Sequence, residues 1–403
     1  MSISLEPGAP LPDGFIPLCV PEIRGNEWTY IKDCLDTNFV SSVGAYVERF
    51  ERDIAARLGT RYAIATVNGT AALHIALLVA GVQPDDEVLV PTLTFIAPVN
   101  AIRYAGAYPV FVDAEPDYWQ MDTHKAIEFL ERECRWSNGE LRDMKTGRRV
   151  KAIVPVDILG HPSDLDPLIA IARKYNLAII EDATESLGAK YKGRAAGQLG
   201  DIACLSFNGN KLITTGGGGM IVTDDEAMAR RAKYLTTQAK DDPLEFVHGA
   251  VGYNYRLSNI QAALGVAQLE KLAEYIDAKR RIAATYTQAL RDMSGLTPMR
   301  EADWAFSVFW MFTLLIDDVR FGLDSRALLH YLDVNKVQTR PLWQPAHLSP
   351  AHPGMRATDC TVAERLNRQA LSLPCSVGLT TSDQARVIEL IRDLKIKNHT
   401  AHR

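Results

Sequence analysis

The sequence IACLSFNGNKLITTGGGGMIVT, residues 202–223, carries most of the information about the fold. Its two apolar runs, Ile202–Phe207 and Met220–Val222, have the length and composition of buried strands. Lys211 lies between them, before four consecutive glycines, and is the one charged side chain in the stretch. An amine among apolar and small groups is held in its neutral, nucleophilic form, as Schiff-base chemistry requires. The alternative is a solvated loop lysine, because most lysines lie on protein surfaces.

Short apolar runs alternate with helical patterns over most of the chain that precedes this stretch. The expected strands are Tyr62–Thr66, Glu87–Val90, Val110–Val112, Ala152–Val156 and Leu177–Ile180. Strands that alternate with helices at this spacing indicate βαβ units. The sequence therefore predicts an α/β fold with a mostly parallel sheet.

The pattern changes in the last third of the chain. A helical pattern runs from Asn259 to about Leu290, and a strand (306–316), a helix (325–332), a strand (337–340) and C-terminal helices follow it. This change predicts two domains. A large α/β domain would span residues 13–258, and a small α+β domain would span residues 259–403, with a linking helix over about 259–290.

Two expected strand ends carry groups suited to a ligand, because open parallel sheets bind ligands at the carboxyl ends of their strands. Gly69 and Thr70 open a helix, where free N–H groups favour a phosphate. A plain turn capped by Thr70 is the alternative. Asp182 follows a buried-looking strand, and Glu185, three residues further on, belongs to the same site or to a capping box.

Together with Lys211, these groups form the set that pyridoxal phosphate requires. A helix start holds the phosphate, a lysine forms an imine with the aldehyde, and an aspartate keeps the pyridine nitrogen protonated. Asp182 and Lys211 follow the helix start at Gly69 in the chain, each in a segment next to an expected strand. The sequence therefore predicts a pyridoxal phosphate enzyme.

Composition excludes several other classes of protein. The chain has 403 residues, of which 47% are hydrophobic and 23% charged, and a net charge of −5, as in ordinary globular proteins. This balance argues against nucleic acid as a partner, and no apolar run approaches the roughly 18 residues of a membrane helix. The beginning MSISLEPGAPLPDG lacks the features of a signal peptide, so we expect a cytoplasmic protein. Six scattered cysteines and nine histidines without tight spacing predict reduced thiols and no metal site.

Five strings along the chain resemble those of the DegT/DnrJ/EryC1/StrS family of sugar aminotransferases, which use pyridoxal phosphate. They are VNGTAALHIAL, VPTLTFIAPVNAI, AIIEDATESLGA, CLSFNGNKLITTGGGGMI and GYNYRLSNIQAALG, and the resemblance extends from about Ile16 to Leu394. It implies the aspartate aminotransferase fold, which is pyridoxal phosphate fold type I. The large domain would then hold a mixed, mostly parallel sheet of seven strands.

The resemblance also implies roles for particular residues. Lys211 would be the Schiff-base lysine and the proton shuttle, Asp182 would pair with the pyridinium nitrogen, and Phe95 would stack on the ring. The phosphate would be bound by Gly69, Thr70, Ser206 and, from the neighbouring subunit, Asn254. The last of these implies a homodimer with shared active sites.

Glu185 departs from the family pattern, since many members carry Gln there, in contact with the phenolic oxygen of the cofactor. A carboxyl group would have to be protonated or bridged by water to make this contact. We keep Glu185 among the expected cofactor contacts with that condition.

The strings NFVSSVGAYVERFE, KTGRRVKAIVPV and TRPLWQPAH resemble LegC-type enzymes in particular. This implies transfer of an amino group from L-glutamate to the C4 keto group of UDP-4-keto-6-deoxy-N-acetylglucosamine, on a route to legionaminic acid or bacillosamine-type sugars of surface glycans. The expected contacts to the sugar nucleotide are Ser41, Ser42, Val43, Arg256, Arg340 and Trp343. Core packing for Trp343, and ion pairs for Arg256 and Arg340, are the alternatives.

Three other functions stay open on the same motifs. A perosamine-type aminotransferase would use GDP-4-keto-6-deoxymannose and share every cofactor motif. A sugar dehydratase of this fold carries histidine in place of the Schiff-base lysine, so Lys211 argues against it. A catalytically silent regulatory relative would not need Lys211 and Asp182, and both are present.

Overall fold

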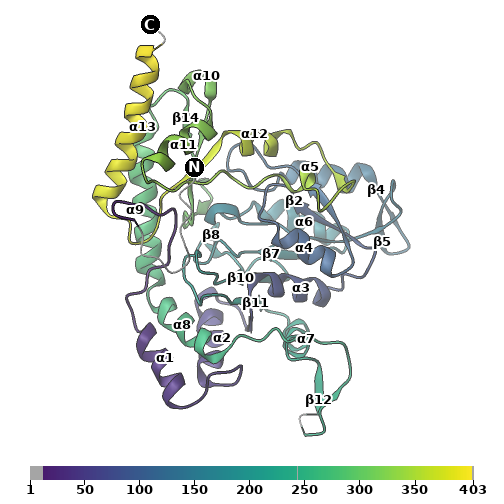
Figure 1. The fold of residues 1–403 in the computed structure, drawn as a ribbon. Coiled ribbons are helices and arrows are strands. Elements are labelled where there is room, and N and C mark those ends of the chain that lie inside the picture. Colours follow the sequence, from purple (N-terminus) through teal and green to yellow (C-terminus); the bar gives the residue numbers. More distant parts are fainter. Residues whose placement is uncertain (1–11, 243, 402–403) are drawn as a thin grey trace.

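A mixed sheet of ten strands forms the centre of the molecule in the computed structural model, which describes residues 12–242 and 244–401 (Figure 1). Its central strands lie in the order β1 (Tyr62–Thr66), β11 (Gly219–Thr223), β10 (Ile202–Ser206), β7 (Ala178–Asp182), β6 (Arg149–Ile153), β2 (Glu87–Pro91) and β3 (Tyr108–Val112). Strand β11 is antiparallel to both neighbours, and the strands from β10 to β3 are parallel. The predicted α/β fold with a mixed, mostly parallel sheet is therefore confirmed.

The expected number of seven strands was too low, because three short strands extend the sheet. Strand β17 (Arg356–Ala357) pairs with β3, and the hairpin of β4 (Cys134–Ser137) and β5 (Glu140–Asp143) pairs with β6. Strand β17 has two residues and comes from the C-terminal third of the chain, and three of the four residues of β4 are exposed. Such segments lack the apolar run or alternation by which strands are recognised in a sequence.

Both faces of this sheet are covered. Val88 and Val90 pack into one hydrophobic cluster, whereas Leu89 between them packs into a second cluster on the opposite face. The covering helices are α2 (Ala45–Leu58), α3 (Gly69–Val79), α4 (Ala97–Tyr104), α5 (Thr123–Glu128), α6 (Leu165–Lys174) and α7 (Glu226–Thr236). Burial on both faces explains why the strands are almost continuously apolar.

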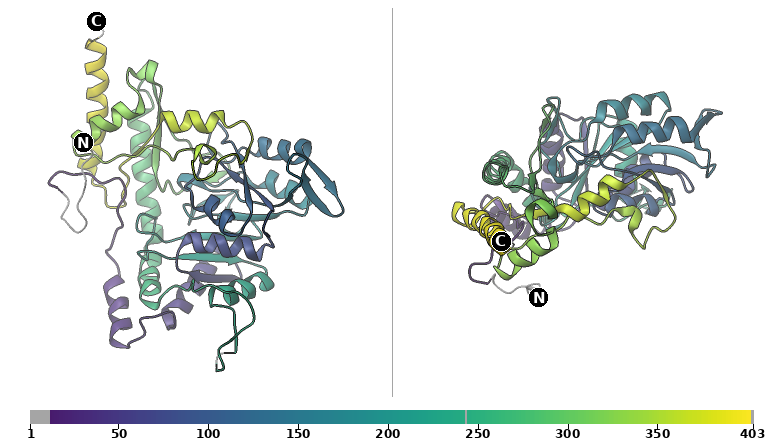
Figure 2. Two further views of the ribbon diagram at one scale, coloured as in Figure 1. Left: turned by 45° about the vertical axis from the view of Figure 1, so that its right-hand side comes forward. Right: turned by 90° about the horizontal axis from the view of Figure 1, so that it is seen from above.

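The C-terminal part contains a second sheet of three antiparallel strands, β14 (Leu296–Pro298), β16 (Phe312–Ile316) and β18 (Ala370–Leu373). Its helices are α10 (Asp318–Phe321), α11 (Ser325–Val334), α12 (Thr361–Gln369) and α13 (Thr381–Ala401). Figure 2 shows α13 beside the long α9 (Leu272–Leu290), at one side of the molecule. The division into domains at residue 258 stays a prediction.

Three expected elements of this part differ from the structure. The strand expected over 306–316 is divided into β15 (Ala305–Phe306) and β16, which pair with different strands. The helix expected over 259–290 consists of α8 (Asn259–Glu270), which packs on α1 (Glu27–Asp36) and α2, and of α9, with Lys271 between them. The strand expected over 337–340 is absent. Val337 and Arg340 form isolated bridges to Ile16 and Ser372, because each has a different partner segment and no ladder can form. None of the described helices has the length and apolar character needed to cross a membrane.

Asp113 connects the end of β3 to helix α12. Its buried carboxylate accepts hydrogen bonds from Lys125 Nζ at 2.7 Å and from the N–H groups of Val362 and Ala363 at 3.1 and 2.8 Å. Cys360, at the N-cap of α12, makes no side-chain cap. Asp113 therefore supplies the cap from a distant part of the chain.

Replacing Asp113 with Ala should lower the free energy of unfolding by about 3 kcal/mol, because it leaves a partly buried ammonium group and two N–H groups without this partner. Denaturation in urea measures the change. Glu128→Ala, which removes an exposed ion pair with Arg132, is the control and should cost less than about 1 kcal/mol. Equal losses in the two variants would contradict the role given to Asp113.

Candidate active site

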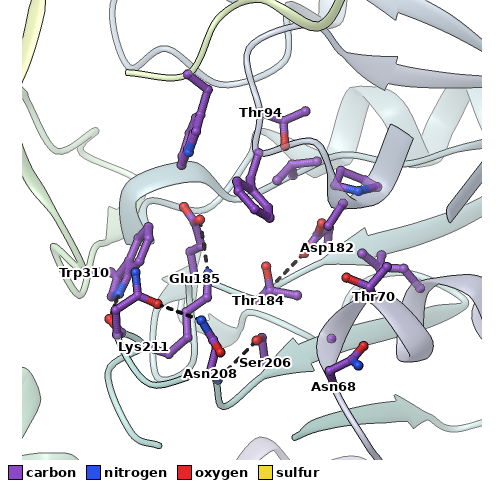
Figure 3. A pocket seen from close by; sticks show the side chains of 18 residues that line it. Asn68, Thr70, Thr94, Asp182, Thr184, Glu185, Ser206, Asn208, Lys211 and Trp310 are labelled. Carbon is purple, nitrogen blue, oxygen red and sulfur yellow. Dashed lines mark hydrogen bonds and ion pairs between the residues drawn. The ribbon is translucent and has the colours of Figure 1, made fainter. Parts of the chain in front are cut away.

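A cavity of about 450 Å³ lies at the carboxyl ends of β7 and β10, beside the first turn of α3 (Figure 3). Its polar lining comes from several segments: Asn68, Gly69, Thr70, Thr94, Asp182, Thr184, Glu185, Ser206, Asn208, Asn210 and Lys211. Phe95, Trp310 and Trp343 are its aromatic lining. The position agrees with the rule that open α/β sheets bind ligands at their strand ends.

Eight of the residues singled out from the sequence meet in this cavity, namely Gly69, Thr70, Phe95, Asp182, Glu185, Ser206, Lys211 and Trp343. Six others do not line it within this one chain: Ser41, Ser42, Val43, Asn254, Arg256 and Arg340. Asn254 and Arg256 bridge Thr237 and Thr66 through their backbones. The roles expected for all fourteen residues stay predictions.

Lys211 is held by two neighbours that differ in chemistry. Its Nζ lies 3.2 Å from Glu185 Oε1 and 4.2 Å from the centre of the Trp310 ring. Trp310 Nε1 in turn donates to the carbonyl oxygen of Asn210 at 2.7 Å, so the ring is fixed against the segment that carries the lysine. With 14% of its side chain exposed, Lys211 reaches the cavity with its amine directed by an anion and by an aromatic face.

Sequence reasoning missed Trp310, which is almost a hundred residues from Lys211 in the chain. It stands in the apolar run SVFWMF, which reads as core, and no local signal distinguishes its ring. Thr94 and Thr184 were missed as well. Thr184 follows Asp182 by two residues, and that spacing beside a strand-end carboxylate could have revealed it.

Glu185 is buried, and both of its carboxylate oxygens have partners. Oε1 pairs with Lys211, and Oε2 accepts the N–H of Leu159 at 2.9 Å. Leu159 has φ of 61°, a left-handed conformation that is rare for a leucine. Burial raises the pKa of Glu185, whereas the charge of Lys211 and the bond from Leu159 oppose the shift. The carboxyl group expected to need a proton or a water therefore has an ammonium partner.

Asp182 is a buried carboxylate with few partners. It is 2% exposed, and Oδ1 accepts the N–H of Thr184 at 3.1 Å. Burial raises the pKa of Asp182 to about 6, against the hydrogen bonds from Thr184 and the charge of Lys211. Among the described residues, no lysine, arginine or histidine forms an ion pair with it. The position is suited to a ligand that brings a positive charge.

The first turn of α3 faces the same cavity. Asn68 caps the helix by accepting the N–H of Ala71 at 2.8 Å, so the expected alternative of a cap by Thr70 was wrong. A Cβ on Gly69 would come within 2.9 Å of Ser206 Cβ, so a glycine is needed for the helix start to approach Ser206 this closely. The hydroxyl groups of Thr70 and Ser206 and the N–H groups of the turn form a site suited to an anion.

Comparison with known proteins agrees with this arrangement. The model of the DegT/DnrJ/EryC1/StrS aminotransferase family matches residues 21–392. A GDP-perosamine synthase from Caulobacter vibrioides is 39% identical over 93% of this chain and 96% of its own. A UDP-N-acetyl-3-dehydro-α-D-glucosamine 3-aminotransferase from Acidithiobacillus ferrooxidans is 33% identical over 89% and 90%. The crystal structure of DesI in the presence of its TDP-sugar product has a TM-score of 0.86 at 29% identity and covers 98% of this chain and 97% of that one.

The family model covers more than nine-tenths of the chain, and the relatives match it over nearly their whole length. Aminotransferases of this family depend on pyridoxal phosphate, which agrees with the cofactor expected from the sequence. The chain belongs to the DegT/DnrJ/EryC1/StrS aminotransferase family and is a pyridoxal-phosphate-dependent aminotransferase.

Proposed function

We propose that the protein transfers an amino group from L-glutamate to the C4 keto group of a nucleotide-linked 4-keto-6-deoxy sugar, for surface glycan synthesis. The observation that carries the proposal is one cavity that joins Lys211, Asp182 and the start of α3, in a chain so similar to a GDP-perosamine synthase. GDP-4-keto-6-deoxymannose is the first candidate substrate. UDP-4-keto-6-deoxy-N-acetylglucosamine, preferred from the sequence strings, becomes the second, because the relative named for a UDP-sugar is less similar.

The residues of the cavity fit pyridoxal phosphate. The anion site of Gly69, Thr70 and Ser206 suits its phosphate, and Asp182 is a buried carboxylate with no ion-pair partner in the described part of the chain. Phe95 lines the same cavity although 55% of it is exposed, and such an exposed aromatic ring is suited to cover a planar ligand. When bound, the cofactor supplies an electron sink for a carbanion at the substrate carbon.

The protein's own groups supply the charges and the proton transfer. Asp182, in its ionised form, stabilises a positive charge on the ring nitrogen. Lys211 Nζ carries the proton to and from the reacting carbon, and Glu185 and Trp310 keep the amine in the cavity during the transfer. Trp343, from the C-terminal part of the chain, adds an apolar wall suited to a sugar ring.

A homodimer with shared active sites is part of the proposal. The segment before Asn254 contains the hairpin of β12 (Lys240–Asp242) and β13 (Val247–His248). It exposes four large apolar side chains, those of Leu244, Phe246, Val247 and Val251. Leu244 and Val251 are 85% and 83% exposed. Exposed apolar side chains so close in the sequence favour burial of this segment against another chain, which here would be a second copy. We propose that Asn254, which follows this segment, contributes to the cavity of the second copy.

A cytoplasmic location is proposed as well. All six cysteines are free thiols in the described structure, including five that are buried. Reduced thiols are typical of the cytoplasm, where disulfides rarely persist.

The proposed function predicts a yellow enzyme in which borohydride links the cofactor covalently to Lys211. Lys211→Ala should lose at least about a thousandfold in turnover, because both the attachment and the proton transfer depend on this amine. Peptide mass spectrometry locates the attachment, and release of 2-oxoglutarate from L-glutamate measures turnover. Lys174→Ala, at an exposed ion pair with Glu131, is the control and should behave like the wild type.

The sugar nucleotide is tested in the same assay with GDP- and UDP-linked 4-keto-6-deoxy sugars. We expect the amino sugar to form faster from the GDP-linked substrate. Faster turnover of the UDP-linked substrate would instead support the UDP-linked sugar that the sequence strings favour. Full activity of Lys211→Ala would overturn the mechanism itself.

In the protein without cofactor, the buried carboxylate of Asp182 should lower the free energy of unfolding once it is ionised. A pKa raised from 3.8 to about 6 means that the folded state binds the proton more tightly than the unfolded chain, so stability falls as pH rises between these values. The free energy of unfolding of cofactor-free Asp182→Asn should therefore exceed that of the wild type by up to about 3 kcal/mol at pH 8, and the difference should vanish near pH 3. Urea denaturation across this range measures the difference.

Asp36→Asn, at an exposed position on α1, controls for the change of charge and should show no such pH dependence. A lower stability of Asp182→Asn at pH 8, or a difference that does not vary with pH, would contradict the cost assigned to the buried carboxylate.

Sharing of the active sites can be tested by mixing two impaired variants. In a mixed dimer of Lys211→Ala and Asn254→Ala, one site combines an intact Lys211 with an intact Asn254 from the other chain. We expect the mixture to recover part of the wild-type turnover after subunit exchange in mild denaturant. If Asn254 acts within its own chain, the turnover of the mixture stays at the sum of the turnovers of the two separate variants.

A further inference from the structure

Three ionisable side chains from distant parts of the chain meet behind the wall of the active-site cavity. They are Cys19, Lys279 of α9 and Cys375, two residues after β18. Lys279 Nζ lies 3.4 Å from Cys19 Sγ and 3.7 Å from Cys375 Sγ, and donates to the carbonyl oxygen of Trp310 at 2.8 Å. We call these three residues the thiol–lysine cluster. The transamination chemistry described above makes no use of it.

Lys279 needs an anionic partner. It is 2% exposed, and an ammonium group buried in this way is costly unless it is paired. Within the described part of the chain, no carboxylate lies at ion-pair distance from its Nζ. Burial lowers the pKa of Lys279, but the two cysteines outweigh burial and leave the pKa raised. The negative charge beside the ammonium therefore comes from sulfur.

Cys19 is the thiol that carries this charge. A hydrogen bond with Cys375 and the charge of Lys279 outweigh burial and lower the pKa of Cys19 to about 6, whereas the pKa of Cys375 is raised. Cys19 is partly exposed and Cys375 is buried, so a small oxidant reaches Cys19 first. The N–H of Cys375 donates to the carbonyl oxygen of Leu18 at 2.8 Å, which places the two cysteine segments side by side.

We propose that Cys19 and Cys375 form a redox pair that hydrogen peroxide oxidises to a disulfide, with Cys19 as the attacking thiolate and Cys375 as the resolving thiol. The Cys19 thiolate attacks one peroxide oxygen, the O–O bond breaks, and the leaving hydroxide takes a proton from Lys279 to become water. The neutral Lys279 amine then takes the proton of Cys375.

The Cys375 thiolate next attacks the sulfenic sulfur of Cys19. The S–S bond forms, and the departing hydroxide takes the same proton from Lys279 to become a second water. One peroxide has then accepted two electrons from the two sulfurs. Lys279 ends as a neutral amine, without the thiolate that balanced its charge.

This change would reach the catalytic lysine along two short routes. Lys279 donates to the backbone of Trp310, whose ring lies against Lys211 Nζ. Cys19 Sγ lies 3.4 Å from the carbonyl oxygen of Asn210, the residue before Lys211, and that oxygen also accepts Trp310 Nε1. Drawing Cys19 toward Cys375 and removing the charge of Lys279 disturbs both contacts. The oxidised enzyme is therefore the less active form.

The test treats the holoenzyme with hydrogen peroxide, blocks the remaining thiols with iodoacetamide and identifies joined peptides by mass spectrometry. We expect a peptide containing Cys19 joined to one containing Cys375, and a several-fold loss of turnover that dithiothreitol reverses. Cys375→Ser and Cys19→Ser should form no joined peptide and resist the loss. The matched control is Cys134→Ser on β4, which should respond like the wild type, because burial raises the pKa of Cys134 to about 12.

A second measurement follows the labelling of Cys19 by iodoacetamide against pH. In the wild type the rate should rise near pH 6, and in Lys279→Met it should rise only at the higher pH of an ordinary thiol. Absence of the joined peptide, an oxygen-bridged link from Cys19 to Lys279 in its place, or labelling of Cys19 with an ordinary pH profile would each overturn the proposal. The peptide and labelling readouts need no substrate, so their failure is distinguishable from a failure of the proposed function.

Discussion

The central sheet is buried on both faces, and this constraint confines charged chemistry to the ends of its strands. Glu181 and Asp182, the last two residues of β7, show how strict it is. Glu181 points to one face, where its oxygens accept the N–H groups of Gly197 and Leu199 at 2.7 and 3.2 Å. Asp182 points to the other face, into the cavity, and among the described residues its carboxylate accepts a hydrogen bond from Thr184 alone. One carboxylate is thus part of the structure, and its neighbour is left available for a ligand.

The surroundings of Lys211 likewise combine residues that belong to the structure with one group that is left available for chemistry. The lysine is held by Glu185, which itself accepts the N–H of Leu159, a leucine with a left-handed backbone. The next residue, Gly160, allows the backbone of Trp310 to approach, since a Cβ there would come within 2.7 Å of Trp310 N. The left-handed backbone at Leu159 and the close packing at Gly160 therefore both help to hold the Lys211 amine in place. Sites of this kind are where proteins depart from their most stable arrangement.

The sequence was sufficient for the features that depend on local pattern. Apolar runs identified all seven central strands, and the isolated lysine, the strand-end aspartate and the glycine at a helix start identified the centre of the cavity. It was insufficient where a feature depends on contacts between distant segments. Trp310, the cap of α12 by Asp113, and the pairing of Lys279 with two cysteines each join segments more than 90 residues apart. No window of the sequence contains both partners of such a contact.

Strand β17 has a consequence for the integrity of the sheet. Its two residues come from the C-terminal third of the chain, yet they pair with β3, and Arg356 holds them there through Asp143 of β5 at 2.8 Å. A fragment that ended at residue 258 would leave this side of β3 with free N–H and C=O groups. Such an open edge is a template for pairing with another chain, and so a route to aggregation. Hydrogen bonds of the large sheet therefore cross the predicted domain boundary at residue 258.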